Sequence, residues 1–130
     1  MKRAWLALTL ALAVHVADEA WNNFLGFYNP FIMMLRDVLL WQWLPTFEFA
    51  EWLTGLIVAI VLLFVLARFS DRRWLAWAAL PYGLALTLNS FAHIGGSLWT
   101  QRILPGTLSA PLLTICGVWL IKSAISKLRS

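Results

Sequence analysis

Charged side chains are scarce in this chain of 130 residues, which has 10 lysine and arginine residues, 6 acidic residues and 62% hydrophobic residues. A soluble domain of this size is about half apolar and about a quarter charged. The scarcity of charge therefore argues against a soluble domain and favours an integral membrane protein. The formal net charge of +4 does not indicate nucleic-acid binding, because the basic residues are divided among several short segments.

Cysteine is rarer still. Cys116 is the only one and lies in an apolar run, so the chain cannot form an intrachain disulfide. The sequence also lacks a phosphate-binding loop, a nucleophile elbow, a haem motif and a dinucleotide-binding fingerprint. It has no internal repeat or low-complexity tract. We therefore expect residues 1–130 to form a single integral membrane domain.

Four apolar stretches are long enough to cross a membrane, which takes about 20 residues of helix. They cover approximately residues 4–21, 47–69, 74–98 and 104–121. A polar turn, Asp71-Arg72-Arg73, separates the second stretch from the third. The predicted fold class is therefore all-α, a four-helix transmembrane bundle.

The segment between the first two stretches, residues 24–45, is aromatic and apolar but interrupted. Asn29-Pro30 is expected to break a helix, and the charges of Arg36-Asp37 argue against a fifth span. We expect residues 31–43 to form a short helix in the membrane interface, lying across the outer mouth of the bundle with its two charges reaching water. The two tryptophans near the end of this segment fit an aromatic belt.

The distribution of basic residues predicts the orientation. With both termini inside, the cytoplasmic residues are Lys2, Arg3, Arg68, Arg72, Arg73, Lys122, Lys127 and Arg129, and the external ones are Arg36 and Arg102. The positive-inside rule then predicts an integral membrane protein with both termini cytoplasmic. A secretory signal peptide is the alternative interpretation of the first stretch, since cleavage after Ala17 would remove His15 and leave three spans.

Ionisable residues inside apolar spans are costly, so they mark candidate functional sites. In the predicted topology, both histidines and four of the acidic residues fall in the outer half of the bilayer. Pairs that are three or four residues apart share a helix face, which favours a common polar centre. The predicted catalytic residues are His15, Glu19, Glu48, Glu51 and His93, with Asp18 and Asn89 in supporting positions.

Some of these residues also have a structural interpretation. Glu48 is typical of a helix N-terminus, where the helix dipole favours a carboxylate, and His93 is typical of a helix C-terminus. Asp18 and Glu19 lie near the end of the first span, where the dipole disfavours anions. We expect Glu19 to be the inward partner of His15 and Asp18 to face water.

Three short motifs resemble those of the HXXEE family of small integral membrane proteins. His15-Val-Ala-Asp18-Glu19 resembles the family's His-x-x-Glu-Glu motif, Asn89-Ser-Phe-Ala-His93 its Asn-x-x-x-His motif, and Ile103-Leu-Pro105-Gly106 its Tyr-x-Pro-Gly motif. Asp18 replaces the first glutamate and Ile103 replaces the tyrosine. The order matches over almost the whole chain. No activity is established for the family, so the resemblance implies a site rather than a reaction.

Three functions are compatible with such a site. The first is acid–base chemistry on a lipid-like substrate, with environments that move the pKa values of the groups apart, loosely similar to sterol isomerases of the emopamil-binding type. The second is binding of a divalent metal such as zinc or iron, for example Zn²⁺ held by His15, Glu19 and His93, with or without Glu48 or Glu51. The third is structural, with polar pairs joining helices at about 1 kcal/mol each. The expected partners are the lipid bilayer and a lipid-like molecule.

Overall fold

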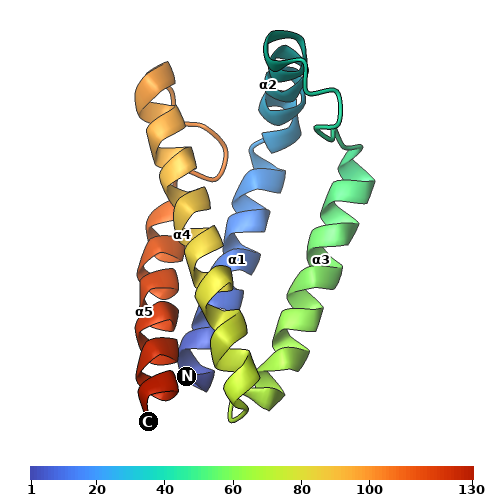
Figure 1. Ribbon diagram of the computed structural model, residues 1–130. Helices are drawn as coiled ribbons and strands as arrows, with labels where there is room; N and C mark the ends of the chain where they lie inside the picture. The colour runs from blue at the N-terminus through green and yellow to red at the C-terminus, as the bar shows by residue number, and fades with distance from the viewer.

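The computed structural model describes residues 1–130, and it contains helices and connecting loops but no strand, which confirms the all-α prediction. Its elements are α1 (Lys2–Trp21), α2 (Phe24–Leu39), α3 (Phe49–Leu66) with a 3₁₀ turn η1 (Ala67–Phe69), α4 (Arg73–Thr100) and α5 (Ala110–Arg129). Both chain ends and the turn between α3 and α4 lie at one end of the bundle, and α2 lies at the other (Figure 1). Four long helices therefore run between the two ends.

Four helices are long and apolar enough to cross a membrane, as the sequence predicted. They are α1, α3 with η1, α4 and α5. The α2 helix has 16 residues, fewer than the length of about 20 that a span requires. By length and composition, the chain is thus an integral membrane protein of four spans.

The buried core runs along α1, which packs against α5 on one side and α3 on the other. The large side chains with almost no exposure include Trp5 and Leu8 of α1, Leu75 of α4, and Leu113 and Leu120 of α5. By contrast, α3 contributes no buried residue. It is joined to α1 by the Trp5 indole, whose Nε1 donates a hydrogen bond to the Leu63 carbonyl oxygen (2.8 Å).

The closest helix pair is α4 with α5, and small residues make this approach possible. A Cβ atom on Gly117 would lie 2.3 Å from Oγ1 of Thr87 and 3.0 Å from the carbonyl oxygen of Gly83. Helices in membranes pack tightly where such small residues face each other. The hydroxyl of Thr87 is directed inward to the Gly83 carbonyl (2.8 Å), so it does not remain unpaired in the contact. This contact therefore sets the spacing between α4 and α5.

The α2 helix differs from its prediction in extent. It begins at Phe24, continues through Pro30 and ends at Leu39, whereas a break at Asn29-Pro30 and a helix over residues 31–43 were expected. Asn29 does not end the helix because its side chain is hydrogen-bonded to the backbone of Phe47. Its Nδ2 donates to the Phe47 carbonyl oxygen (2.9 Å), and its Oδ1 accepts from the Phe47 N–H (3.1 Å). This pairing ties α2 to the segment before α3. The interfacial location of the helix stays a prediction.

Arg36, in the last turn of α2, also differs from expectation. Its guanidinium donates from Nε to the Leu44 carbonyl oxygen (2.8 Å) and is half-buried, so it holds the link in place instead of reaching water. Asp37, its neighbour, is exposed as predicted. The charge of Arg36 therefore has a structural use within the link.

The last helix begins at Ala110, not near residue 104 where the fourth span was predicted to begin. Residues 104–109 instead form a loop that runs back along the bundle. Gly106 in this loop has φ +84°, a left-handed conformation that favours glycine. The loop therefore brings polar groups against α1 and α4 that a continuous helix would have kept apart.

Candidate functional site

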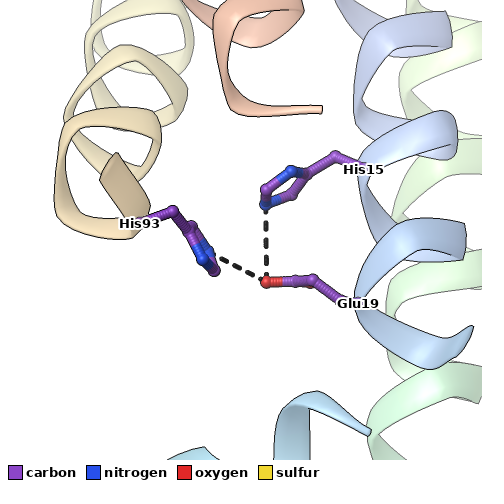
Figure 2. Close-up of side chains that lie close together, drawn as sticks. All are labelled: His15, Glu19 and His93. Atoms are coloured by element: carbon purple, nitrogen blue, oxygen red, sulfur yellow. Dashed lines mark ion pairs between the residues drawn. The ribbon is translucent and has the colours of Figure 1, made fainter. Parts of the chain in front are cut away.

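Three predicted residues meet in a buried cluster. His15 and Glu19 come from successive turns of α1, and His93 comes from α4 (Figure 2). Oε1 of Glu19 lies 3.4 Å from Nε2 of His15 and 3.1 Å from Nε2 of His93. All three side chains are buried, and their ligating atoms lie within 4.8 Å of one another. The carboxylate is thus positioned between two imidazoles with little access to water.

The backbone of Gly106 holds the two imidazoles in place. A Cβ atom at this position would lie 2.8 Å from Cε1 of both His15 and His93. The two rings meet edge to face, with centroids 4.8 Å apart. Only a residue without a side chain can approach both rings so closely, which gives a physical reason for a glycine after Pro105.

Behind His15 lies a second layer of polar groups formed by Ser109 and Asp18. Oγ of Ser109 lies 2.8 Å from Nδ1 of His15 and donates a hydrogen bond to Oδ2 of Asp18 (2.7 Å). The Ser109 backbone N–H donates to the same oxygen (3.1 Å), and Asn22 Nδ2 donates to Oδ1 (2.7 Å). Asp18 is therefore half-buried and occupied by three donors, and the expectation that it would face water is wrong because the 104–109 loop folds over it.

Sequence analysis did not identify Ser109. The run Ser109-Ala110-Pro111 is typical of the start of a helix, and this signal would have placed Ser109 at the same end of the bundle as the histidines. Nothing in the pattern, however, directs its hydroxyl to His15. That direction depends on the course of the 104–109 loop.

Asn89 occupies the supporting position that was expected for it. Its Nδ2 lies 3.1 Å from Nε2 of His15, one turn before His93 on α4. His15 therefore has a partner at each ring nitrogen, Ser109 at Nδ1 and Asn89 at Nε2. This leaves the ring little freedom to rotate.

The structure does not bring Glu48 and Glu51 to this cluster. Both are exposed at the beginning of α3, and neither forms an ion pair or hydrogen bond with His15, Glu19 or His93. Aromatic rings occupy the space between, since the ring of Phe24 lies 5.8 Å from those of both Trp52 and His93. The position of the two carboxylates fits the favourable interaction of acids with a helix N-terminus.

An apolar pocket of about 700 Å³ adjoins the cluster. Aromatic residues of α2, including Phe24, Phe27 and Phe31, line one side, and small residues of α4 such as Ala92 line another. The polar lining includes His93 and Asn89, which connect the pocket to the cluster. Pockets of roughly 300–1,000 Å³ are typical of small-molecule sites.

Tyr28 adds a polar group to the α2 side of the pocket. Its hydroxyl donates a hydrogen bond to the Pro45 carbonyl oxygen (3.2 Å). Burial raises the pKa of Tyr28 above its ordinary value, although the nearby Arg36 acts in the opposite direction. The hydroxyl is therefore a neutral donor at physiological pH.

Comparison of the chain with protein-family models, with curated proteins and with solved structures finds no match.

Proposed function

We propose that this integral membrane protein binds a lipid-like molecule in the apolar pocket and transfers protons at the polar end of that molecule. The observation that carries the proposal is the junction of two features at His93. This residue lines the pocket and also contacts the Glu19 carboxylate, with Nε2 3.1 Å from Oε1. An apolar molecule with one polar end would place that end against His93 and Asn89.

The cluster has the groups that proton transfer requires. Imidazole and carboxylate are the side chains most often used as general acids and bases, and such groups contribute about 10²–10⁴-fold to rate. In the proposed reaction a proton leaves a carbon of the lipid, passes through His93 to Glu19, and returns to a different carbon. The lipid is isomerised without gain or loss of atoms or electrons, so no oxidant is needed.

We also propose that the chain belongs to the HXXEE family. Residues from all three motifs meet at the cluster: His15 and Glu19 from the first, Asn89 and His93 from the second, and Gly106 from the third. This convergence supports a common role for the motifs. It also accounts for the replacement by Asp18, because the shorter carboxylate bonds to Ser109 and not to either histidine.

We expect deuterium to enter the lipid when the protein is incubated in D₂O. The protein would be placed in nanodiscs made from a lipid extract of its host membrane, and the lipids analysed by mass spectrometry for deuterium on carbon. Glu19→Gln should reduce incorporation by about 100-fold, because the amide cannot accept the proton. Ala92→Trp should abolish it by filling the pocket.

Ala85→Trp is the matched control, since Ala85 lies two turns earlier on α4, is exposed and does not line the pocket. This variant should retain the incorporation of the unmodified chain. Equal incorporation in the Glu19→Gln and unmodified proteins, or none in any of them, would contradict proton transfer by this cluster.

The orientation of the chain is part of the proposal. The positive-inside rule places both termini in the cytoplasm, and the cluster then lies in the outer half of the bilayer. In a Cys116→Ala background, Ser130→Cys should react with a membrane-impermeant maleimide from the cytoplasmic side only, and Arg102→Cys from the opposite side only. Labelling of both positions from one side would contradict a four-span topology.

A further inference from the structure

We infer that His15, Glu19 and His93 bind one divalent transition-metal ion, with the ligand chemistry of zinc, and that the open coordination position faces the apolar pocket. The inference names a cofactor for the same cluster and so deepens the proposed function. The role of the metal in lipid chemistry rests on that proposed function. Binding of the metal itself can be measured without any lipid.

The hydrogen bonds around His15 determine which ring nitrogen carries a proton. Oδ2 of Asp18 accepts a hydrogen bond from the Ser109 backbone N–H (3.1 Å), so it is the acceptor in its contact with the Ser109 hydroxyl as well. The single hydroxyl hydrogen of Ser109 is donated to the two oxygen acceptors beside it, Oδ2 of Asp18 (2.7 Å) and the Gly106 carbonyl oxygen (3.1 Å). The remaining contact, 2.8 Å between Ser109 Oγ and His15 Nδ1, needs a hydrogen from the ring. Nδ1 of His15 is therefore the protonated nitrogen.

It follows that Nε2 of His15 is the ring nitrogen that can present a lone pair to the cluster. The Asn89 side chain agrees with this assignment, because its Nδ2, 3.1 Å away, is a donor to this lone pair without the metal, and a metal ion would take the place of that donor. The same lone pair lies 3.4 Å from Oε1 of Glu19, which is another acceptor. Two acceptors in a buried position repel each other unless a proton or a cation lies between them. A cation would satisfy both histidines and the carboxylate together.

The two histidine–glutamate distances fit a tetrahedral zinc site, and all three ligand atoms lie within 4.8 Å of one another, so the imidazoles would close on the ion. Bonds of about 2.0–2.1 Å from zinc to nitrogen and oxygen place neighbouring ligand atoms about 3.3–3.4 Å apart. The observed separations are 3.4 Å for His15 Nε2 to Glu19 Oε1 and 3.1 Å for His93 Nε2 to Glu19 Oε1. Two histidines and one glutamate with an open fourth position are a ligand set of catalytic zinc sites.

Ser109 and Asp18, which lie behind His15, also provide the hydrogen bonds that a metal site requires. Histidine ligands commonly donate their second ring N–H to a hydrogen-bonded polar group, which fixes the tautomer and orients the ring. Here His15 Nδ1 donates to Ser109, and Ser109 donates to Asp18. Ser109 and Asp18 are thus positioning residues for the metal ligand.

The open position is directed to the pocket because His93 and Asn89 line it. An oxygen at the polar end of a lipid could therefore complete the coordination. Glu19 contacts both histidines through Oε1, so its second oxygen remains available to accept a proton. With the metal bound, Nε2 of His93 is a ligand atom, so the proton of the proposed reaction would pass directly to this second oxygen of Glu19 and not through His93.

The test is zinc binding by the full chain in detergent. Protein stripped with a chelator would be titrated with Zn²⁺ by calorimetry and with Co²⁺ by absorption, which shows intense visible bands for tetrahedral coordination. We expect one ion per chain. Glu19→Gln and His93→Gln should weaken zinc binding by about 100-fold or more, and Ser109→Ala by about 10–100-fold, as for other residues behind metal ligands. Ser109→Thr should restore binding because it keeps the hydroxyl.

Asp37→Asn is the matched control, as Asp37 is an exposed carboxylate outside the cluster. It should bind zinc like the unmodified chain, and thermal melting would confirm that each variant is folded. Ala92→Trp should also keep its zinc, so a failure of lipid binding can be distinguished from a failure of metal binding. Absence of stoichiometric zinc, or equal affinity in Glu19→Gln and the unmodified chain, would overturn the inference.

Discussion

Replacing Gly106 with alanine is expected to lower the free energy of unfolding by about 3 kcal/mol and to weaken zinc binding strongly. The left-handed conformation at φ +84° costs an alanine about 1–2 kcal/mol. The added Cβ would also lie 2.8 Å from ring carbons of both His15 and His93, so at least one imidazole must move. Both effects act on the 104–109 loop, which contacts His15 and His93 directly. We therefore expect the loss of stability and the loss of zinc binding to occur together.

The measurement is unfolding in mixed micelles of a mild and a denaturing detergent, followed by helix content, alongside zinc titration. Gly55→Ala is the control, because a Cβ atom on Gly55 meets nothing within 4 Å. In a helix that substitution should be neutral or stabilise by up to about 1 kcal/mol. An equal response of the two variants would contradict the described position of Gly106 between the imidazoles.

Replacing Gly117 with alanine should destabilise the bundle by about 2 kcal/mol through the α4–α5 contact. The new Cβ would lie 2.3 Å from Thr87 Oγ1 and 3.0 Å from the Gly83 carbonyl oxygen. The hydroxyl can move only by giving up its bond to Gly83, and the carbonyl can move only with its helix. We therefore expect α4 and α5 to separate and His93 to shift with α4.

A second substitution separates this explanation from a general loss of helix stability. Thr87→Ala removes the closest atom, so the Gly117→Ala, Thr87→Ala double variant should be more stable than the sum of the two single effects predicts. The expected coupling is about 1 kcal/mol, measured by the same detergent unfolding. Strict additivity would show that the two residues do not meet as described.

The helices and the cluster members His15, Glu19 and His93 could be predicted from the sequence because each depends on local rules. Apolar runs of sufficient length predict spans, and the i,i+4 spacing of His15 and Glu19 places them on one helix face. Both histidines were expected in the outer half of the bilayer, and that expectation required only the topology. The buried cluster of His15, Glu19 and His93 agrees with this part of the prediction.

The parts that were not predicted depend on loops and on which faces meet. Nothing local indicates that residues 104–109 return along the bundle, so the contacts of Ser109 with His15 and Asp18 were missed. Glu48 and Glu51 lie at the expected end of the second span, but position along a helix does not specify a direction around its axis. The helix through Pro30 was missed because its tether, Asn29 to Phe47, joins residues that are 18 positions apart.

The partners of His15 are synthesised several seconds after His15 itself. Asn89 and Ser109 lie 74 and 94 residues after it in the chain. At about 5–20 residues per second, the first helix exists for several seconds before α5 follows it. During that interval α1 carries a histidine and two carboxylates that lack their final contacts, and such groups are costly within a bilayer. Arrival of the last hairpin removes that cost, so completing the cluster supplies a driving force for the final step of membrane assembly.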